Sequence, residues 1–299
     1  MKETAIKEKI KSCADICESA LEEYLSIKDP DLESLFEAER YSLLAGGKRI
    51  RPFLTLAFSK ALGGNESEAL VYACALEMIH TYSLIHDDLP CMDDDDYRRG
   101  RLTNHKVYGE AVALLAGDGL LTAAFERVSV WSLAGLYDAE TAVKAINELS
   151  VYAGSRGMIG GQIIDIANES NPDADYETLQ LMDNLKTGCL ISVACALGCI
   201  VAGASDDLID AAKTFGGKLG LAFQIKDDIL DVTSSLEKLG KMTGSDKENN
   251  KSTYVTLLGI EKCEELVKQL TNEALESLNA FPNNELIKEY AGYLANREY

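Results

Sequence analysis

The chain has 299 residues, 46% hydrophobic and 26% charged, so it can bury a sizeable core and does not have a disordered composition. Its formal net charge of −20 argues against nucleic acid and anionic membrane surfaces as partners. A small anionic ligand stays compatible with this charge, because a local group of basic residues outweighs the distant field at contact range.

Apolar residues recur at helical spacing along most of the chain, beginning with a stripe from Ile6 to Tyr24. The same pattern covers residues 31–45, 66–86, 107–130, 139–153, 175–203, 205–234 and 260–280. No alternating run bounded by turn residues suggests a strand, so strands should be absent or trivial. The sequence therefore predicts a single all-α domain over residues 1–299, a large bundle of long helices.

Eight cysteines are present, several inside apolar helical runs and none in a CxxC pair. This usage is typical of small core residues in a reducing compartment rather than of a disulfide framework or zinc site. The charged start "MKETAIKEKIKS" shows no apolar signal segment. We therefore expect a cytoplasmic protein.

Nineteen consecutive residues, Thr187 to Ser205, carry no charge and would be long enough to cross a bilayer. The segment is rich in Ala, Gly, Cys and Ser and has no aromatic residue, unlike most membrane spans. We interpret it as a central helix buried on all sides, with no membrane span.

The stretch "HDDLPCMDDDD", residues 86–96, collects six aspartates around Pro90. The helical pattern before it ends at this proline, so Asp87 and Asp88 should lie at a helix C-terminus. Carboxylates are disfavoured there by the helix dipole unless a cation is present. For residues 94–96 a solvated acidic loop is the simpler interpretation.

A second acidic cluster lies in "FQIKDDILDV", where Asp227 and Asp231 are one helical turn apart and Asp228 is adjacent. We expect the three carboxylates to point roughly one way. Such oxygen ligands select hard cations, above all Mg²⁺, which is usually completed by waters and substrate phosphates. An exposed acidic face is the alternative, but the surrounding apolar residues favour a mostly buried helix.

Basic residues form local groups in this acidic chain. "GGKRIRP" contains Lys48, Arg49 and Arg51, and "YRRGR" follows the first acidic cluster. Arginine forks and lysine charges are the usual holders of phosphate. Since no Walker-type or dinucleotide glycine motif occurs, the pattern predicts a non-nucleotide polyphosphate site.

The succession "DDLPCMD", "RRG", "KTG" and "FQIKDDILD" resembles the short-chain trans-isoprenyl diphosphate synthases, nearest to the bacterial farnesyl diphosphate synthases. The resemblance extends from "GGKRIRP" to the C-terminal region. It implies the isoprenoid synthase fold, with the two aspartate motifs facing each other across a central cavity, and a homodimer.

The resemblance also implies roles for individual residues. The ligands of about three Mg²⁺ ions, with Mn²⁺ able to substitute, would be Asp87, Asp88, Asp93, Asp227 and Asp231. The allylic diphosphate would be held by Arg98, Lys186, Thr187, Gln224 and Lys241, and isopentenyl diphosphate by Lys48, Arg51, His80 and Arg99. The catalytic set would be Asp87, Asp93, Asp227, Arg98, Lys186 and Lys241. Asp228 would be an outer acceptor.

The implied reaction condenses dimethylallyl or geranyl diphosphate with isopentenyl diphosphate, head to tail, to farnesyl diphosphate. Ionisation of the allylic diphosphate gives a cation, the double bond of isopentenyl diphosphate attacks it, and the departing diphosphate takes the proton. No side-chain nucleophile is needed, which agrees with the absence of a Ser-His-Asp or Cys-His signature.

Tyr82 is the candidate for setting product length. It lies five residues before Asp87, about 7–8 Å deeper along the helix, where a bulky ring should stop growth at fifteen carbons. The alternative is that Tyr82 packs against a neighbouring helix and that the product is geranylgeranyl diphosphate.

Two other classes fit less well. An "HD" phosphohydrolase would pair His86 with Asp87 but needs further histidines, and only His80 and His105 remain. A class I terpene cyclase would carry an Asn-Ser-Glu motif in place of the second aspartate motif.

The chain departs from the family at Asn250, where glycine is common, at Val255, where proline is common, and in its end "NREY", which lacks a clear basic tail.

Overall fold

The computed structural model describes residues 2–26, 29–169, 175–233 and 252–297. The helices of the first half are α1 (Lys2–Tyr24), α2 (Glu33–Leu43), α3 (Ile50–Ala61), α4 (Glu66–Asp87), α5 (Asn104–Tyr108), α6 (Glu110–Leu133) and α7 (Ala139–Ala153). Those of the second half are α8 (Met158–Glu169), α9 (Tyr176–Asp183), η1 (Asn184–Gly188), α10 (Cys189–Val201), α11 (Asp206–Thr233), α14 (Tyr254–Leu258), α15 (Ile260–Ser277), η2 (Leu278–Ala280) and α16 (Glu285–Ala295).

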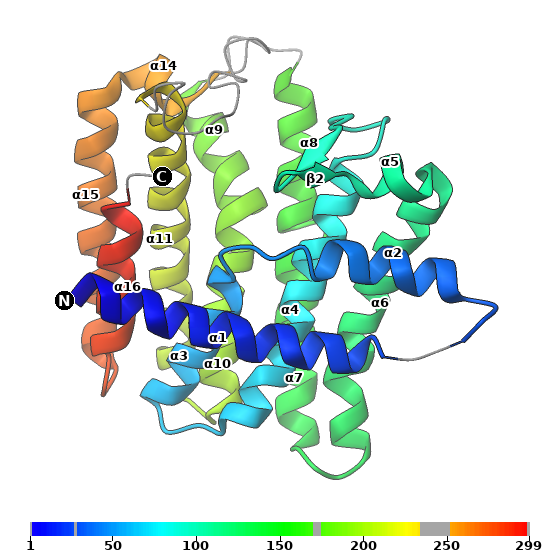
Figure 1. The fold of residues 1–299 in the computed structure, drawn as a ribbon. Helices are drawn as coiled ribbons and strands as arrows, with labels where there is room; N and C mark the ends of the chain where they lie inside the picture. The colour runs from blue at the N-terminus through cyan, green and yellow to red at the C-terminus, as the bar shows by residue number, and fades with distance from the viewer. Residues whose placement is uncertain (1, 27–28, 170–174, 234–251, 298–299) are drawn as a thin grey trace.

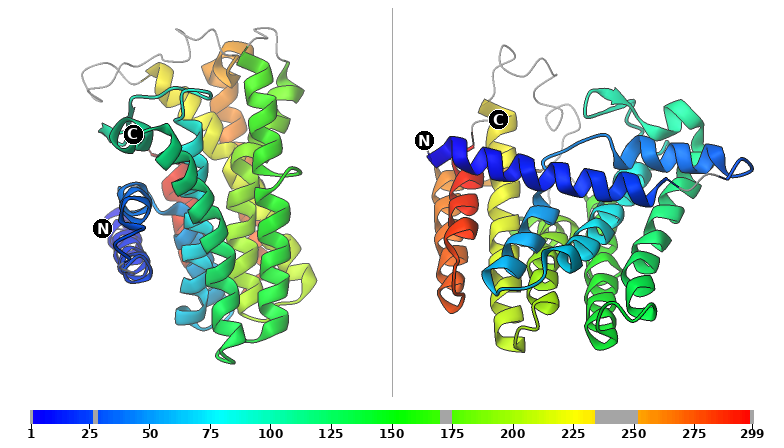
Figure 2. Two further views of the ribbon diagram at one scale, coloured as in Figure 1. Left: turned by 90° about the vertical axis from the view of Figure 1, so that its right-hand side faces the viewer. Right: turned by 60° about the horizontal axis from the view of Figure 1, so that its bottom comes forward.

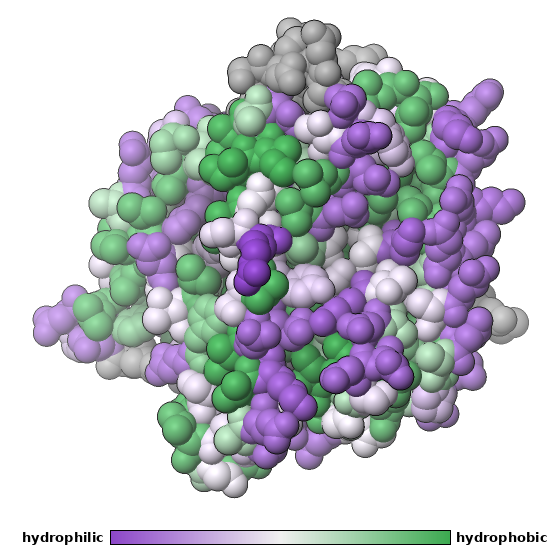
Figure 3. All heavy atoms as spheres, turned by 180° about the vertical axis from the view of Figure 1, so that it is seen from behind, coloured by the Kyte–Doolittle hydropathy of each residue, from purple (hydrophilic) through white to green (hydrophobic). Residues whose placement is uncertain are grey.

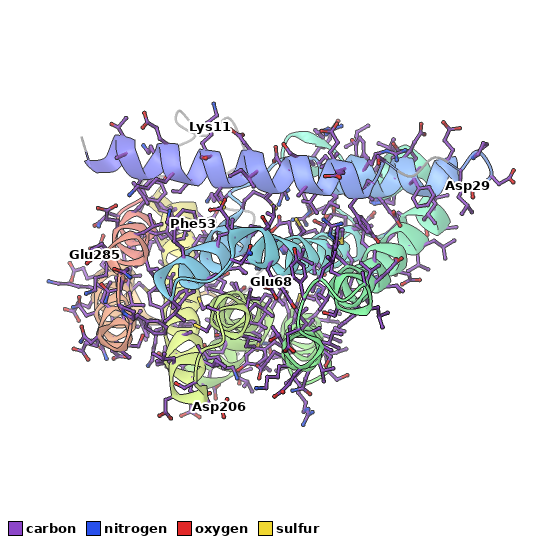
Figure 4. The ribbon with its side chains drawn as sticks, turned by 90° about the horizontal axis from the view of Figure 1, so that it is seen from below. Lys11, Asp29, Phe53, Glu68, Asp206 and Glu285 are labelled. Carbon is purple, nitrogen blue, oxygen red and sulfur yellow. The ribbon has the colours of Figure 1, made fainter. Side chains whose placement is uncertain are left out.

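The predicted all-α bundle is confirmed. Most long helices run side by side, and α1 lies across one side of them (Figures 1 and 2). Figure 4 looks at these helices from below, with α1 along one edge and Lys11 on its outer side. In the described residues the only strands are β1 (Tyr97–Arg98) and β2 (Arg101–Leu102). Each strand has two residues, and the two strands pair antiparallel as a hairpin.

The core is centred on α4 and α10. Every residue of α10 from Leu190 to Ile200 is buried, and α10 packs against α3, α4, α7 and α11. The run Tyr176–Val201 is the one described helical stretch with the length and composition of a membrane span, but 67% of its most apolar window is buried inside the protein. Its burial agrees with the predicted central helix.

Side-chain caps start several helices where the sequence changes from turn residues to an apolar stripe. Asn65 accepts hydrogen bonds from the backbone N–H groups of Ser67 and Glu68 at the start of α4. Asp175 accepts from Thr178 N at the start of α9, at 2.9 Å. These caps fix where each helix begins, and therefore which residues reach its far end.

The functional motifs meet at one end of the bundle. In Figure 1 the C-terminal ends of α4 and α11, the hairpin and the start of α9 all lie at the upper end. α4 ends at Asp87, with Asp88 as its C-cap residue, as predicted. The two acidic clusters, more than a hundred residues apart in sequence, therefore belong to the same region.

Part of the surface away from the core is apolar. Figure 3 shows that hydrophobic residues gather in patches between polar ones on the back of the molecule. The large apolar side chains of α6, α7 and α8 with more than half of their surface exposed are Leu115, Leu133, Val143 and Ile163.

Candidate active site

The first acidic cluster is shaped by the loop that follows α4. The backbone N–H of Asp93 donates to the carbonyl of Asp87 at 2.9 Å, which folds the loop back over the helix end. Burial raises the pKa of Asp87 to about 6, and the negative charges of Asp93 and Asp88 add to this rise, while Lys186 and Arg98 oppose it. The cations near Asp87 therefore do not offset the cost of its negative charge, as expected of a carboxylate that binds a metal cation.

Asp88 lies beside Asp87 in sequence but has a different partner. Its carboxylate is buried, and its Oδ1 accepts a hydrogen bond from Arg98 Nε at 2.7 Å and lies 2.6 Å from Arg98 Nη2 in the same ion pair. Burial raises the pKa of Asp88, and Arg98 opposes that shift. In this conformation Asp88 holds the hairpin to α4, so its predicted role as a metal ligand stays a prediction.

The hairpin separates two adjacent arginines. Its turn residues Arg99 and Gly100 both have positive φ, 53° and 75°. Two-residue hairpin loops favour turns with this backbone conformation. As a result Arg98 reaches Asp88, whereas Arg99 Nη1 donates to the carbonyl of Gly46 in the "GGKRIRP" loop. The two arginines therefore reach different parts of the site, and their assignment to two different diphosphates stays a prediction.

Three of the four basic residues predicted for isopentenyl diphosphate, Arg51, His80 and Arg99, come together, whereas Lys48 lies nearer Asp227. The pKa of His80 is held well below its usual value, first by burial and then by the charges of Arg51, Arg99, Arg49 and Arg98. Burial also lowers the pKa of Arg51 to about 10, and neighbouring Arg99 contributes. Glu77 partly offsets this positive charge, and the arginines that outnumber it are suited to holding a diphosphate.

Arg49, from the same motif, has a structural role. It is 3% exposed, and its Nη1 donates to Glu77 on α4 at 2.6 Å. Its Nη2 donates to the carbonyl of Leu43 at 2.7 Å, which secures the end of α2. Lys48, next to it, is instead exposed, and its Nζ lies 5.5 Å from the centre of the Phe223 ring.

The "KTG" motif forms a π-helical turn, η1, inside the run from α9 to α10. Lys186 Nζ forms an ion pair with Asp165 of α8, and Thr187 Oγ1 donates to Gln224 of α11 at 3.4 Å. The close approach of α8 needs Gly161, because a Cβ there would lie 2.3 Å from the backbone N of Lys186. η1 thus places its polar side chains between α8, α11 and Asp87.

The second acidic cluster does not point one way, which corrects the prediction. Asp227 Oδ1 accepts from Arg297 Nη2 at 2.7 Å, and 41% of the Asp227 side chain is exposed. Asp228 is 8% exposed and accepts from the backbone N–H of Tyr254 at 3.0 Å, so it secures α14. This placement fits the outer-acceptor role expected for Asp228. Asp231 is partly exposed on the same helix as Asp227.

A buried carboxyl group, Asp183, lies behind this cluster. Burial raises its pKa to about 8, and Asp228 and Asp165 add to the shift, while Tyr254 and Lys186 oppose it. Asp183 therefore links the end of α9 electrostatically to both η1 and α11. Sequence reasoning did not identify Asp183, Asp165 or Arg297, because none stands in a motif whose spacing indicates a ligand.

The donor set fits Mg²⁺. Carboxylate oxygens are its preferred protein ligands, and the raised pKa of Asp87 reflects burial and then repulsion from Asp93 and Asp88, both of which a divalent cation would offset. Within the described residues, no three His, Cys, Asp or Glu side chains are placed to hold a metal ion by themselves. Mg²⁺ bound here would need waters and substrate phosphates to complete its coordination.

The histidines do not support a phosphohydrolase site. His86 Nε2 lies 3.0 Å from the carbonyl of Leu114 on α6, and His105 Nδ1 lies 3.2 Å from Thr103 Oγ1. His80 lies among arginines. Lys241, predicted to hold the allylic diphosphate, and Asn250 lie outside the described residues.

Comparison with known proteins identifies the class. Residues 33–294 match the polyprenyl synthetase family. The chain is 46% identical over 281 residues to a chloroplastic geranylgeranyl pyrophosphate synthase of Capsicum annuum, covering 93% of this chain and 75% of that protein. It is 44% identical over 289 residues to the large subunit 1 of a heterodimeric geranylgeranyl pyrophosphate synthase of Arabidopsis thaliana, covering 95% and 77%.

Solved structures agree. An FPP/GFPP synthase from Zymomonas mobilis superimposes with a TM-score of 0.88 at 33% identity, covering 98% of this chain and 99% of the other. A geranyltransferase from Helicobacter pylori, complexed with magnesium and isoprenyl diphosphate, gives 0.82 at 36% identity, covering 99% and 96%. The fold is therefore the isoprenoid synthase fold, and the chain belongs to the polyprenyl synthetase family of prenyltransferases. The narrower expectation of a farnesyl diphosphate synthase is not confirmed.

Proposed function

We propose that this protein joins isopentenyl diphosphate head to tail to an allylic diphosphate and releases geranylgeranyl diphosphate, with twenty carbons. The observation that carries the prenyl transfer is that the end of α4, at Asp87, and the C-terminal part of α11, which contains Asp227, lie at the same end of the bundle, with separate basic groups beside the two carboxylates. Lys186 approaches Asp87, and Lys48 approaches Asp227.

The basic groups divide the work. Arg98 and Lys186 lie by the first acidic cluster, where they would hold the allylic diphosphate and stabilise its departure. Lys48, Arg51, His80 and Arg99 would hold isopentenyl diphosphate. About three Mg²⁺ ions, when bound by Asp87, Asp93 and Asp227, would neutralise the leaving diphosphate. The magnesium in the Helicobacter pylori structure supports this assignment.

The names of the curated relatives support a twenty-carbon product, since both compared above are geranylgeranyl pyrophosphate synthases. One observation favours farnesyl diphosphate as a second candidate. Tyr82 is 5% exposed on α4, and burial, with a smaller contribution from the charge of Asp87, raises its pKa to about 12, so its hydroxyl lies near the acidic cluster. Its ring also stands edge-on to His86, which contacts α6.

One experiment tests both levels of the proposal. Purified protein is incubated with dimethylallyl diphosphate, excess isopentenyl diphosphate and Mg²⁺, and the dephosphorylated alcohols are separated. Geranylgeraniol should dominate, and farnesol as the end product would select the second candidate. Excess EDTA should abolish turnover and Mg²⁺ or Mn²⁺ should restore it; turnover in EDTA would overturn the metal assignment.

We also propose a homodimer in the cytoplasm. The exposed apolar side chains of α6, α7 and α8, with Val143 65% and Ile163 64% exposed, are suited to burial against a second copy. All eight cysteines are free, which suits a reducing compartment. Light scattering should give the mass of a dimer, and Ile163→Glu should shift it toward the monomer. A monomeric wild type at micromolar concentration would refute the dimer.

A further inference from the structure

Arg297, near the end of the chain, reaches the second acidic cluster. It follows α16 by two residues, and its Nη2 donates both to Asp227 Oδ1 at 2.7 Å and to the carbonyl of Phe223 at 2.9 Å. Its guanidinium carbon lies 3.7 Å from the centre of the Phe223 ring. Because residues 223 and 227 are one turn apart on α11, a single planar group spans that turn.

This arrangement is poor for stability alone. Arg297 is 7% exposed, and among the described residues its buried Nε and Nη1 have no hydrogen-bond partner. Unsatisfied buried donors are costly, and the charge of nearby Lys48 is repulsive. Packing alone would not require a guanidinium at this position, so the charge of Arg297 and its contact with Asp227 need another explanation.

The pair leaves Asp227 able to bind a cation. Arg297 engages only Oδ1, and 41% of the Asp227 side chain remains exposed. A carboxylate fixed through one oxygen presents the other in a defined direction. Partners behind a metal ligand commonly orient it in this way, and their loss typically weakens metal binding by about 10–100-fold.

We propose that Arg297 is a positioning residue, which holds Asp227 so that Oδ2 faces the Mg²⁺–diphosphate complex. The inference rests on the proposed function, because it takes Asp227 to be a metal ligand. It gives the chain's C-terminal segment a task in the site: docking of residue 297 completes the second acidic cluster.

Binding of inorganic pyrophosphate, measured calorimetrically with and without Mg²⁺, tests the proposal without relying on turnover. Arg297→Gln should weaken the Mg²⁺-dependent binding about 10–100-fold and leave the binding in EDTA unchanged. Arg297→Lys, which keeps the charge but not the planar fork, should recover part of the loss. The Mg²⁺ concentration for half-maximal turnover should rise in parallel.

Arg127→Gln is the matched control. Arg127, on α6, is also stacked on aromatic rings, 5.1 Å from the centre of Tyr24, and also has a buried unpartnered Nε. It should leave pyrophosphate binding unchanged. Should Arg297→Gln fail to fold in a thermal melt, Arg297→Lys decides, with weaker Mg²⁺-dependent binding expected.

Three results would overturn the inference. Unchanged binding in Arg297→Gln would give Arg297 no role at the metal. Tighter binding would make it a competitor that occupies the place of the cation. A wild type that neither binds pyrophosphate with Mg²⁺ nor makes a prenyl product would refute the proposed function itself, whereas an active wild type with an unaffected Arg297→Gln would refute the inference alone.

Discussion

Arg98 contacts a single oxygen of Asp88: Nε donates a hydrogen bond to Oδ1 at 2.7 Å, and Nη2 lies 2.6 Å from the same oxygen in an ion pair, which holds the hairpin against the end of α4. The Asp88 carboxylate is buried by this contact, with 4% of the side chain exposed. The pair keeps the first acidic cluster and the hairpin arginines in a fixed relation before any substrate binds.

Asp88→Asn should therefore destabilise the protein, because the amide cannot replace a buried carboxylate beside Arg98. We expect a loss of about 1–3 kcal/mol in the free energy of unfolding, measured by urea titration. Asp95→Asn is the control: its side chain is 54% exposed and 3.6 Å from Arg98, so its loss should stay below about 1 kcal/mol. Equal losses would show that burial of Asp88 does not matter.

Asp183 predicts a pH dependence of stability. Its pKa is about 8 in the folded protein, above the ordinary carboxyl value of about 4, so between these pH values the folded state holds a proton that the unfolded state has lost. Its contribution to stability therefore falls as pH rises from about 4 to about 8. Asp183→Asn should gain about 1–3 kcal/mol relative to wild type between about pH 5 and about pH 8.5.

Thermal or urea unfolding at several pH values measures this effect. Asp31→Asn, at an exposed loop position, is the control and should show a constant difference from wild type. A difference between Asp183→Asn and wild type that does not change with pH would mean that Asp183 is ionised in the folded state.

The two groups of cations should separate in steady-state kinetics. Lys48→Gln and Arg99→Ala should mainly raise KM for isopentenyl diphosphate. Lys186→Gln, which also breaks the ion pair with Asp165, should act on the allylic substrate and lower kcat by about 10²–10³-fold. One common pattern for all three variants would refute the division into two diphosphate sites.

Tyr82→Ala tests what limits product length. If the ring blocks the growing chain, the variant should release products longer than those of wild type, as resolved by chromatography of the alcohols. The alternative, core packing against His86 and α6, predicts an unchanged product and a loss of about 3–5 kcal/mol in stability, as for a buried aromatic residue. Ile85→Ala, a buried position on α4, controls for the effect of a cavity alone.

Strong periodicity predicted the helices well. The pattern over residues 139–153 coincides with α7, and that over 66–86 ends one residue short of α4. Among the described helices of more than ten residues, three lie outside the predicted ranges. α3 has Pro52 in its first turn, α8 contains Gly160 and Gly161, and α16 is only 11 residues long. In each, tertiary packing outweighs weak local signals.

The resemblance implied that the motifs of Asp87 and Asp227 face each other, but neither it nor the spacing of the residues could give side-chain directions. Asp227 and Asp228 are adjacent on a helix, about 100° apart, and one faces Arg297 while the other accepts from Tyr254. The partners Asp165 and Arg297 lie far away in sequence, and only the folded chain brings them to the site. Sequence spacing reports what shares a helix face, and contacts between helices need the structure.

The π-helical turn η1 changes the rotation of α9 relative to α10 within one continuous helix. A π turn closes its hydrogen bonds one residue later than an α-helical turn, so it adds about one residue, or about 100°, to the phase between α9 and α10. The buried surroundings of α10 fix the directions of its side chains. The extra residue in η1 lets Lys186 and Thr187 point in directions that an unbroken α-helix would not give them. Deleting one residue from Asn184–Gly188 would leave both flanking helices intact while rotating α9 relative to α10 and misaligning Lys186 with Asp165.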